Sequence, residues 1–246
     1  MTGAIGVVGG VGPLAAAHFY QRLLQLSGAD RDEEYPAVIL VAERVPSRIA
    51  HLSGTGPSPL PVLMKVARRL VAAGAESIVI PSATTHAYRG EIAAAGGVPV
   101  FNLLEETGRR LGERKYRNPL VLATESTVGL GLFEPYLKNG IRARYPSVSE
   151  QHEVNGFIEA VKRGADPEAG RRKLALWINE KAPHYGADSV VLGCTELPLI
   201  NPGGSLRLPT VDTTDVLAEA VLRRTAAPQG DEAASTSLPI LVRKSF

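Results

Sequence analysis

Short apolar runs alternate along the chain with longer stretches in which apolar side chains recur at helical spacing. Most of the short runs show no polar alternation, which is typical of parallel strands buried on both faces. We expect strands at Ala4–Val8, Val38–Ala42, Ser77–Ile80, Val98–Phe101, Leu120–Ala123, Arg142–Tyr145, Ser189–Leu192 and Pro209–Val211.

The longer stretches predict helices. Pro13 suits the first position of a helix, and Gly74 suits the position just after a helix end. Because strands and helices alternate, we expect an α/β protein with parallel sheet. The expected helices are Pro13–Leu26, Leu60–Ala73, Leu104–Arg114, Ser149–Arg163, Pro167–His184 and Asp215–Arg224.

One strand and its following turn occur twice. GAESIVIPSATT (74–85) aligns without a gap with GADSVVLGCTEL (186–197), at an offset of 112 residues that places Ser82 on Cys194. The repeat predicts two similar lobes with parallel β-sheets flanked by helices, related by a pseudo-twofold axis. Since ligands bind at the carboxyl ends of parallel strands, we expect Ser82 and Cys194 to meet in an active-site cleft between the lobes.

The repeat also gives expected domain limits. The first lobe comprises residues 1–103 plus 212–225, because the last predicted helix crosses back onto it, and the second lobe comprises residues 104–211. Residues 226–246 are polar and then briefly apolar. We interpret them as a C-terminal tail that only a partner orders.

Composition narrows the partners of this 246-residue chain. Its 27 Lys and Arg nearly balance its 25 Asp and Glu, which gives no electrostatic reason to bind nucleic acid or an anionic membrane. Glycines interrupt the first apolar run and no basic segment precedes it, so we expect no signal peptide and no membrane span. The single cysteine excludes an internal disulfide and fits a cytoplasmic protein. No cluster has metal-ligand spacing, so we expect no metal site.

Cys194 is the residue with the most distinctive chemistry. A single cysteine in an apolar strand is usually a small buried hydrophobic residue. Here it follows Gly193 at the end of a strand and precedes the polar pair Thr195 and Glu196. We expect a helix to begin at this point, whose N-terminus would lower the pKa of the thiol. We therefore interpret Cys194 as an activated thiolate, and we expect His86 to order the loop after Ser82.

The glycine loop GVGPLA (10–15) follows the first predicted strand. It matches the dinucleotide pattern G-x-G-x-x-A, although short glycine loops at this position are common and the match is weak. A tight strand-to-helix turn is an equally simple interpretation. We favour an intermediate one, in which backbone amides around Gly12 hold a small carboxylate at a helix N-terminus. A dehydrogenase is the less favoured reading, because it would also need a nicotinamide pocket.

Seven segments of the chain occur in an order found in one enzyme family. They are GVVGGVGPLA, VPSR, PSATTHA, LATESTVGLGLFEPYL, EAVKRG, GCTEL and VDTTDVLAEAV, between about residues 3 and 224. This series resembles the aspartate/glutamate racemase superfamily, and most closely its aspartate racemase branch. The resemblance implies a homodimeric amino-acid racemase that acts at Cα of a small acidic amino acid without pyridoxal phosphate (PLP-independent) or any other cofactor.

The resemblance also implies roles for individual residues. Cys194 matches the second of two catalytic cysteines, and Ser82 stands where the first is usually found. Arg48 and Lys162 match positions that hold the carboxylates of the substrate, and Thr127 matches a carboxylate-binding hydroxyl. Further substrate-contacting threonines are implied at Thr84 and Thr195.

Racemisation needs one group that removes the Cα proton and another that delivers a proton to the opposite face. Without a metal or pyridoxal group, backbone amides, hydroxyls and cations must stabilise the resulting enediolate-like anion. A thiol suits both tasks, because its pKa of about 8.5 can be tuned toward neutrality. The hydroxyl of Ser82 is a poor base, but it can donate a proton to a strongly basic carbanion.

The sequence departs from the family pattern around the site. Besides Ser82, Ala83 replaces a usual Asn, and Ser47 replaces a usual Asp before Arg48. These changes affect recognition of the amino group, and they leave aspartate open as the substrate.

Three interpretations of Ser82 follow. In the favoured one, the protein is an asymmetric racemase in which Cys194 serves one enantiomer and Ser82 is the weaker partner. In the second, the site performs one-cysteine chemistry as a decarboxylase or isomerase of a related diacid. In the third, a serine has been substituted for a native cysteine and inactivates a racemase. A non-catalytic binding module is a further alternative, against which the retained Cys194 and its neighbouring cations argue.

Overall fold

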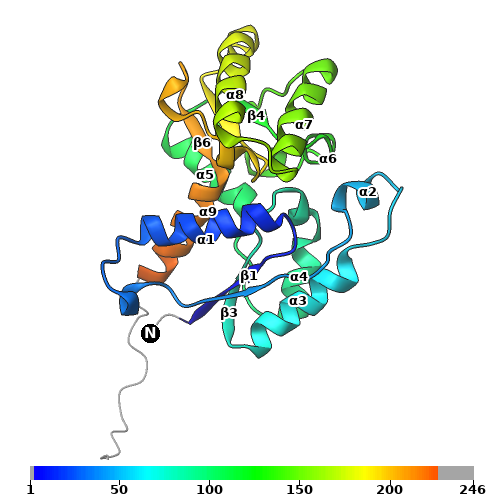
Figure 1. The fold of residues 1–246 in the computed structure, drawn as a ribbon, viewed down its shortest axis with the longest axis vertical. Coiled ribbons are helices and arrows are strands. Elements are labelled where there is room, and N and C mark those ends of the chain that lie inside the picture. Colours follow the sequence, from blue (N-terminus) through cyan, green and yellow to red (C-terminus); the bar gives the residue numbers. More distant parts are fainter. Residues whose placement is uncertain (1–2, 227–246) are drawn as a thin grey trace, which may run out of the picture.

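The computed structural model describes residues 3–226 as two parallel β-sheets with helices packed around them (Figure 1). The first sheet has the strand order β2-β1-β3, and the second has the order β4-β5-β6. The strands are β1 (Ala4–Val8), β2 (Val38–Val41), β3 (Ala75–Val79), β4 (Pro119–Leu122), β5 (Ser189–Leu192) and β6 (Thr210–Asp212). In each sheet the central strand pairs in parallel with both neighbours, so the carboxyl ends of the strands lie at one edge.

Helices connect the strands and cover the sheets. The α-helices are α1 (Pro13–Ser27), α2 (Arg48–Leu52), α3 (Leu60–Ala72), α4 (Arg89–Gly96), α5 (Leu103–Glu113), α6 (Glu125–Gly129), α7 (Val148–Lys162), α8 (Pro167–Lys181) and α9 (Thr213–Ala226). Short 3-10 helices are η1 (Asp32–Glu34), η2 (Thr84–Tyr88), η3 (Glu134–Tyr136), η4 (Ala182–Tyr185), η5 (Leu197–Ile200) and η6 (Gly203–Ser205). The predicted α/β class with two parallel sheets is confirmed.

Two of the predicted strands are wrong. The segments 98–101 and 142–145 each form only an isolated bridge, between Ile78 and Val100 and between Leu120 and Arg144. Each segment exchanges just two backbone hydrogen bonds with the neighbouring strand before it leaves the edge of the sheet. The sequence therefore placed both segments correctly beside the sheet, but neither pairs along enough residues to form a strand.

The helices form three layers around the two sheets, as Figure 1 shows from α3 and α4 at one end to α7 and α8 at the other. Helices α3 and α4 cover the outer face of the first sheet, where Leu63, Leu70 and Ile78 are fully buried. Helices α7 and α8 cover the outer face of the second sheet. Helices α1, α5 and α9 lie between the sheets, and one hydrophobic cluster there includes side chains of both sheets. The middle layer therefore joins the lobes through a shared core.

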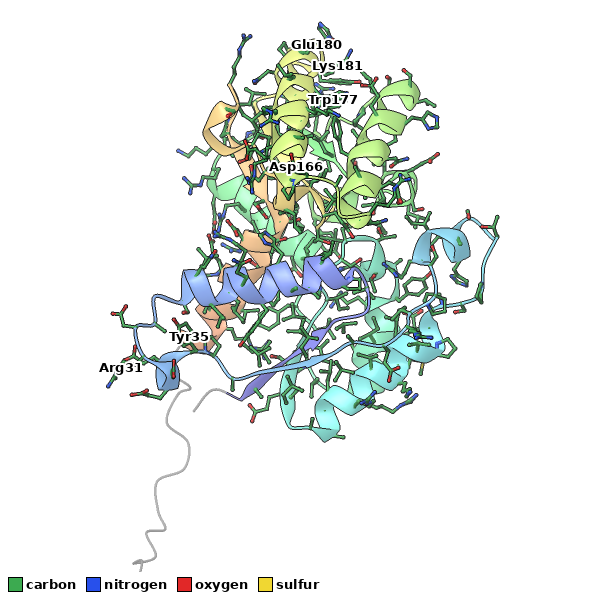
Figure 2. All side chains as sticks on the ribbon, viewed as in Figure 1. Arg31, Tyr35, Asp166, Trp177, Glu180 and Lys181 are labelled. Atoms are coloured by element: carbon green, nitrogen blue, oxygen red, sulfur yellow. The ribbon has the colours of Figure 1, made fainter. Side chains whose placement is uncertain are left out.

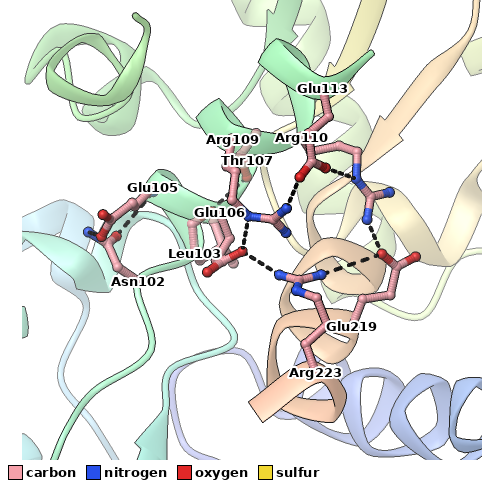
Figure 3. A network of polar contacts seen from close by, with 10 residues as sticks. All are labelled: Asn102, Leu103, Glu105, Glu106, Thr107, Arg109, Arg110, Glu113, Glu219 and Arg223. Carbon is pink, nitrogen blue, oxygen red and sulfur yellow. Dashed lines mark hydrogen bonds and ion pairs between the residues drawn. The ribbon is translucent and has the colours of Figure 1, made fainter. Parts of the chain in front are cut away.

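Helix α9 follows the last strand of the second sheet and packs against α1 and α5. Arg22 of α1 binds Asp215 of α9 at 2.6 Å. Ion pairs also link α9 to α5 in the network of Figure 3, where Glu106 accepts from Arg223 at 2.6 Å and Glu219 accepts from Arg110. The lobe limits given above stay a prediction, and residues 227–246 of the expected tail lie outside the described residues.

Two side chains show how local sequence positions α8 in the second lobe. Asp166 caps the helix by accepting from the backbone N–H groups of Glu168 and Ala169. Trp177, labelled with Asp166 in Figure 2, donates to Glu153 of α7 at 2.8 Å, which fixes α8 against α7. In the described part of the chain, no helix combines the length and the apolar character needed to cross a membrane.

Candidate active site

Ser82 lies just beyond the carboxyl end of β3, which neighbours the central strand of the first sheet. Cys194 lies just beyond the carboxyl end of β5, the central strand of the second sheet. The N–H groups of Gly193 and Cys194 both donate to the carbonyl of Leu122, at 2.8 and 3.1 Å. Gly193 suits this approach because a Cβ there would lie 3.2 Å from that carbonyl oxygen and from the ring of Phe133. The thiol is therefore held at the end of its strand by close backbone packing.

The predicted acid/base residues meet in one cavity of about 20 Å³ between the two lobes. The first lobe contributes Ser82 and the second Cys194, and both side chains are buried. The lining residues are Val11, Arg48, Ile49, Ser82, Ala83, Thr84, Thr124, Lys162, Cys194, Thr195 and Glu196. Of the predicted substrate-binding residues, Thr127 and Gly12 are not in the lining, although each adjoins a residue that is.

Two cations lie in the lining. Arg48 opens α2, and its Nε is buried without a hydrogen-bond partner among the described residues. Burial lowers the pKa of Arg48, whereas the negative charge of Glu196 opposes that shift. Lys162 is the last residue of α7. Its Nζ lies 3.1 Å from Glu159 Oε1, and its side chain is 34% exposed. Arg48 therefore has unused donor capacity in the cavity, and Lys162 provides a second, more solvated positive charge.

Threonine hydroxyls connect the lobes at the cavity. Thr84 of the first lobe lies 3.0 Å from Thr124 and 2.8 Å from Thr127, and these two hydroxyls are 2.9 Å apart. Thr124 also caps α6 by accepting from the N–H of Thr127. Nearby, Thr195 of the second lobe donates to the carbonyl of Pro81 at 3.0 Å. The sequence pointed to Thr84, Thr127 and Thr195 but not to Thr124, whose T-x-x-T spacing was the available signal.

The turn that holds Ser82 is fixed by its own hydrogen bonds. Ser82 Oγ accepts from the hydroxyl of Thr85 at 2.8 Å, which leaves the Ser82 O–H as a donor. His86 Nε2 accepts from the N–H of Leu103 at 3.0 Å, so Nδ1 carries the proton and donates to the Ser82 carbonyl at 2.8 Å. Burial lowers the pKa of His86 to about 4 and keeps the ring neutral. The expected ordering of this loop by His86 is confirmed.

The surroundings of Cys194 correct the prediction of a lowered thiol pKa. The turn after Cys194 is the short 3-10 helix η5 rather than an α-helix, so a strong helix dipole is lacking there. Burial raises the pKa of the Cys194 thiol well above its usual range, and the nearby Glu196 carboxylate raises it further. The thiol is therefore in its protonated form at neutral pH.

Glu196 is a site residue that the sequence did not single out. Its Oε2 accepts a hydrogen bond from Cys194 Sγ at 2.9 Å, and its side chain is buried. The signal was the repeat itself, because the same offset that pairs Cys194 with Ser82 pairs Glu196 with Thr84. The site thus combines one thiol, one carboxylate, two cations and a set of hydroxyls. Within residues 3–226, no group of three or more His, Cys, Asp or Glu could hold a metal ion.

Comparison with known proteins assigns the family. The model of the Asp/Glu/hydantoin racemase family matches residues 8–221. The chain belongs to this family. It is 26% identical over 224 residues to the broad specificity amino-acid racemase RacX of Bacillus subtilis, covering 89% of this chain and 96% of that protein.

Solved structures of racemases share the fold. The aspartate racemase of Picrophilus torridus superimposes with a TM-score of 0.82 at 25% identity, covering 91% of this chain and 94% of that one. The glutamate racemase of Thermus thermophilus, solved with β-chloro-D-alanine, gives a TM-score of 0.59 at 22% identity, covering 92% and 83%. The two-lobe α/β architecture of this racemase-family enzyme is thus that of its relatives.

Proposed function

We propose that the protein is a cofactor-independent racemase of a small acidic amino acid, of the aspartate or glutamate type, and that Cys194 is its acid/base thiol. The observation that carries this proposal is the shared cavity, in which Cys194 and Ser82 come from opposite lobes with Arg48 and Lys162 beside them. A substrate with two carboxylates complements those two positive charges. The names of the relatives, aspartate racemase and broad specificity amino-acid racemase, support the same substrate class.

The mechanism starts with the carboxylates of the substrate on Arg48 and Lys162. The Cys194 thiolate removes the Cα proton from one face, and the electrons of the broken C–H bond pass into an enediolate-like anion. Cations and hydroxyls that are already in place stabilise this anion without reorganisation, which is the usual source of large rate effects. Ser82 then donates its O–H to the opposite face of Cα, since its oxygen already accepts from Thr85.

The two directions of this reaction are unequal. A thiolate is a competent base, whereas the proton of a serine hydroxyl is held far more tightly than that of a thiol. Proton removal by Cys194 should therefore be fast for one enantiomer, and removal on the Ser82 side should be slow for the other.

The cavity between the lobes has room for about one water molecule, so the lobes must separate to admit an amino acid.

Proton NMR in deuterated buffer tests the proposal. We expect Cα exchange for one enantiomer of aspartate or glutamate in the wild type, and a loss of about 100-fold or more in Cys194→Ala, the range for removal of a general base. Ser82→Cys should restore racemisation in both directions. Ser205→Cys adds a thiol at an exposed position and should change nothing. Absence of exchange with every amino acid, even in Ser82→Cys, would refute the racemase assignment.

A one-cysteine decarboxylase or isomerase of a related diacid is the second candidate. It is favoured by the presence of only one thiol in the cavity and a hydroxyl on the opposite side. Substituted malonates added to the same NMR experiment separate the two functions, because decarboxylation produces a new α-proton signal and carbon dioxide. From the resemblance we also propose that the protein is a cytoplasmic homodimer. Sedimentation of the purified protein tests its oligomeric state.

A further inference from the structure

Cys194 and Glu196 form a contact that the reaction scheme above does not use. The thiol donates to Glu196 Oε2 at 2.9 Å, within one turn that follows β5. The side chains of both residues are buried, with 7% and 6% of their surface exposed. A buried carboxylate needs a partner that offsets its desolvation. Within residues 3–226, the Cys194 thiol donates the side-chain hydrogen bond that this carboxylate accepts.

The second oxygen of Glu196 lies in a space that a glycine leaves open. Gly12 has φ 113°, and a Cβ at this position would lie 3.0 Å from Glu196 Oε1. Gly12 precedes α1, so the strand-to-helix turn of the first lobe closes directly onto the carboxylate of the second lobe. The glycine turn therefore accommodates a carboxylate that belongs to the protein, and binding of a substrate carboxylate by its backbone amides stays a prediction.

The charges that face the pair are cationic. Arg48 of α2 interacts electrostatically with both Glu196 and Cys194, and Lys162 of α7 acts on Cys194. Tyr88, at the end of η2, faces Arg48. A substrate carboxylate that binds Arg48 would take up part of the positive charge that otherwise balances Glu196.

The other half of the site has no equivalent pair. The repeat places Thr84 opposite Glu196, and its hydroxyl is occupied by Thr124 and Thr127. Ser82 in turn contacts Thr85. Among the groups that hydrogen-bond to these side chains, none is a carboxylate, so proton transfer that produces a base is available on the Cys194 side alone.

From this geometry we propose that Glu196 is the proton acceptor of Cys194, so that the reactive thiolate forms by transfer of the thiol proton within the pair. This inference rests on the proposed racemase chemistry. The S–H bond breaks and a Glu196 O–H bond forms. The thiolate then removes the Cα proton, which re-forms S–H, and Glu196 releases its proton to solvent after the product leaves. The proton that Ser82 delivers to Cα is replaced from solvent, so the cycle needs no other reactant.

Alkylation of the free protein with iodoacetamide tests the pair without any substrate. Because the chain has a single cysteine, the reaction reports Cys194 alone. We expect the pH midpoint of alkylation to move to lower pH by about one unit or more in Glu196→Gln, because the negative charge that opposes the thiolate is removed. Glu33→Gln, which changes a carboxylate with 68% exposure on η1, is the matched control and should leave the profile unchanged.

Cα exchange on the same variants tests the proton transfer itself. In Glu196→Gln we expect kcat to fall about 100-fold or more with little change in KM, and Glu196→Asp should recover part of it. An unchanged alkylation profile in Glu196→Gln overturns the proposal, and so does a shifted profile with wild-type exchange. If Glu196→Gln does not fold, Glu196→Asp is judged by the same two criteria. If the wild type exchanges no amino acid, the proposed function fails, while the pair is still decided by alkylation.

Discussion

At the scale of single residues, the chemistry lies where the internal repeat is broken. The repeat pairs Ser82 with Cys194 and Thr84 with Glu196. Each pair occupies equivalent backbone, yet one member is a hydroxyl and the other a thiol or carboxylate. The turns that present them have the same form, a strand followed by a 3-10 helix. One backbone plan therefore presents two different kinds of proton chemistry to the same cavity.

The first residue-scale prediction concerns Gly12. In Gly12→Ala, an alanine would have to keep the positive φ of 113°, and its Cβ would lie 3.0 Å from Glu196 Oε1. We expect a loss of about 1–2 kcal/mol in unfolding free energy from the backbone strain. We also expect slower Cα exchange, because the carboxylate that contacts Cys194 must move. Urea unfolding and proton NMR measure the two effects.

Gly28 is the matched control at the other end of α1. It also has a positive φ, of 68°, but a Cβ there meets nothing within 4 Å. Gly28→Ala should therefore lose a similar amount of stability and keep the Cα exchange rate of the wild type. Equal exchange rates in the two variants would contradict the role assigned to the Gly12 turn.

The sequence predicts the meeting of Ser82 with Cys194 because a gapless repeat fixes equivalent positions on equivalent folds. It does not predict the direction of the thiol pKa. That direction depends on burial and on where the Glu196 side chain points at the start of η5, and a linear pattern contains neither. Thr124 is missed for a similar reason, because its hydroxyl contacts Thr84 of the other lobe and the sequence does not show that contact.

At the scale of elements, His86 connects the Ser82 turn to the first turn of α5. The ring accepts from Leu103 N and donates to the Ser82 carbonyl. In His86→Ala both buried backbone groups lose their partner, and each loss costs about 1–3 kcal/mol. We expect a decrease on the order of 3 kcal/mol in unfolding free energy, measured by urea denaturation at pH 7.

His51→Ala serves as the comparison for His86→Ala. His51 is only half-buried, and its ring shares a single hydrogen bond of 2.7 Å with the Tyr88 hydroxyl. Its removal should cost about 1 kcal/mol, the usual value for one such bond. Losses of equal size in the two variants would show that the two hydrogen bonds of His86 stabilise the fold no more than the one hydrogen bond of His51.

Element prediction from the sequence succeeds where burial is symmetric and the run is long. β1 and β5 have the predicted bounds because both are fully paired central strands with buried apolar side chains. Helices α2, α4 and α6 were not predicted, since each spans eight residues or fewer and too few turns to show a period. The predicted helix 167–184 ends as an α-helix at Lys181, and Pro183 lies in the 3-10 helix η4 that follows.

At the scale of the whole molecule, α9 joins the second sheet to the middle layer, and the half-buried acid Asp212 at the end of β6 directly precedes it. Asp212 Oδ1 accepts from Thr214 N at 2.8 Å and Asp215 N at 3.2 Å, and Asn201 donates to Oδ2. Burial, together with the charge of Asp215, raises the pKa of Asp212 from 3.8 to about 6. The fold therefore favours the protonated acid. Its contribution to stability is fully present below pH 3.8 and is lost as the pH rises through about 6.

Asp212→Asn should remove this pH-dependent penalty, because the amide keeps an acceptor for the α9 cap but carries no charge. The full shift corresponds to about 3 kcal/mol, of which roughly half is lost between pH 5 and pH 8. The pKa of His86 is lowered, so acidification reduces the unfolding free energy through His86 while it increases it through Asp212. The pH dependence of the wild type alone therefore cannot report on Asp212. The measurement is the difference in unfolding free energy between variant and wild type, which we expect to grow by about 1 kcal/mol in favour of the variant from pH 5 to pH 8. The exposed Asp32→Asn should show no such change, and an equal change in both variants would place the effect outside the junction of β6 and α9.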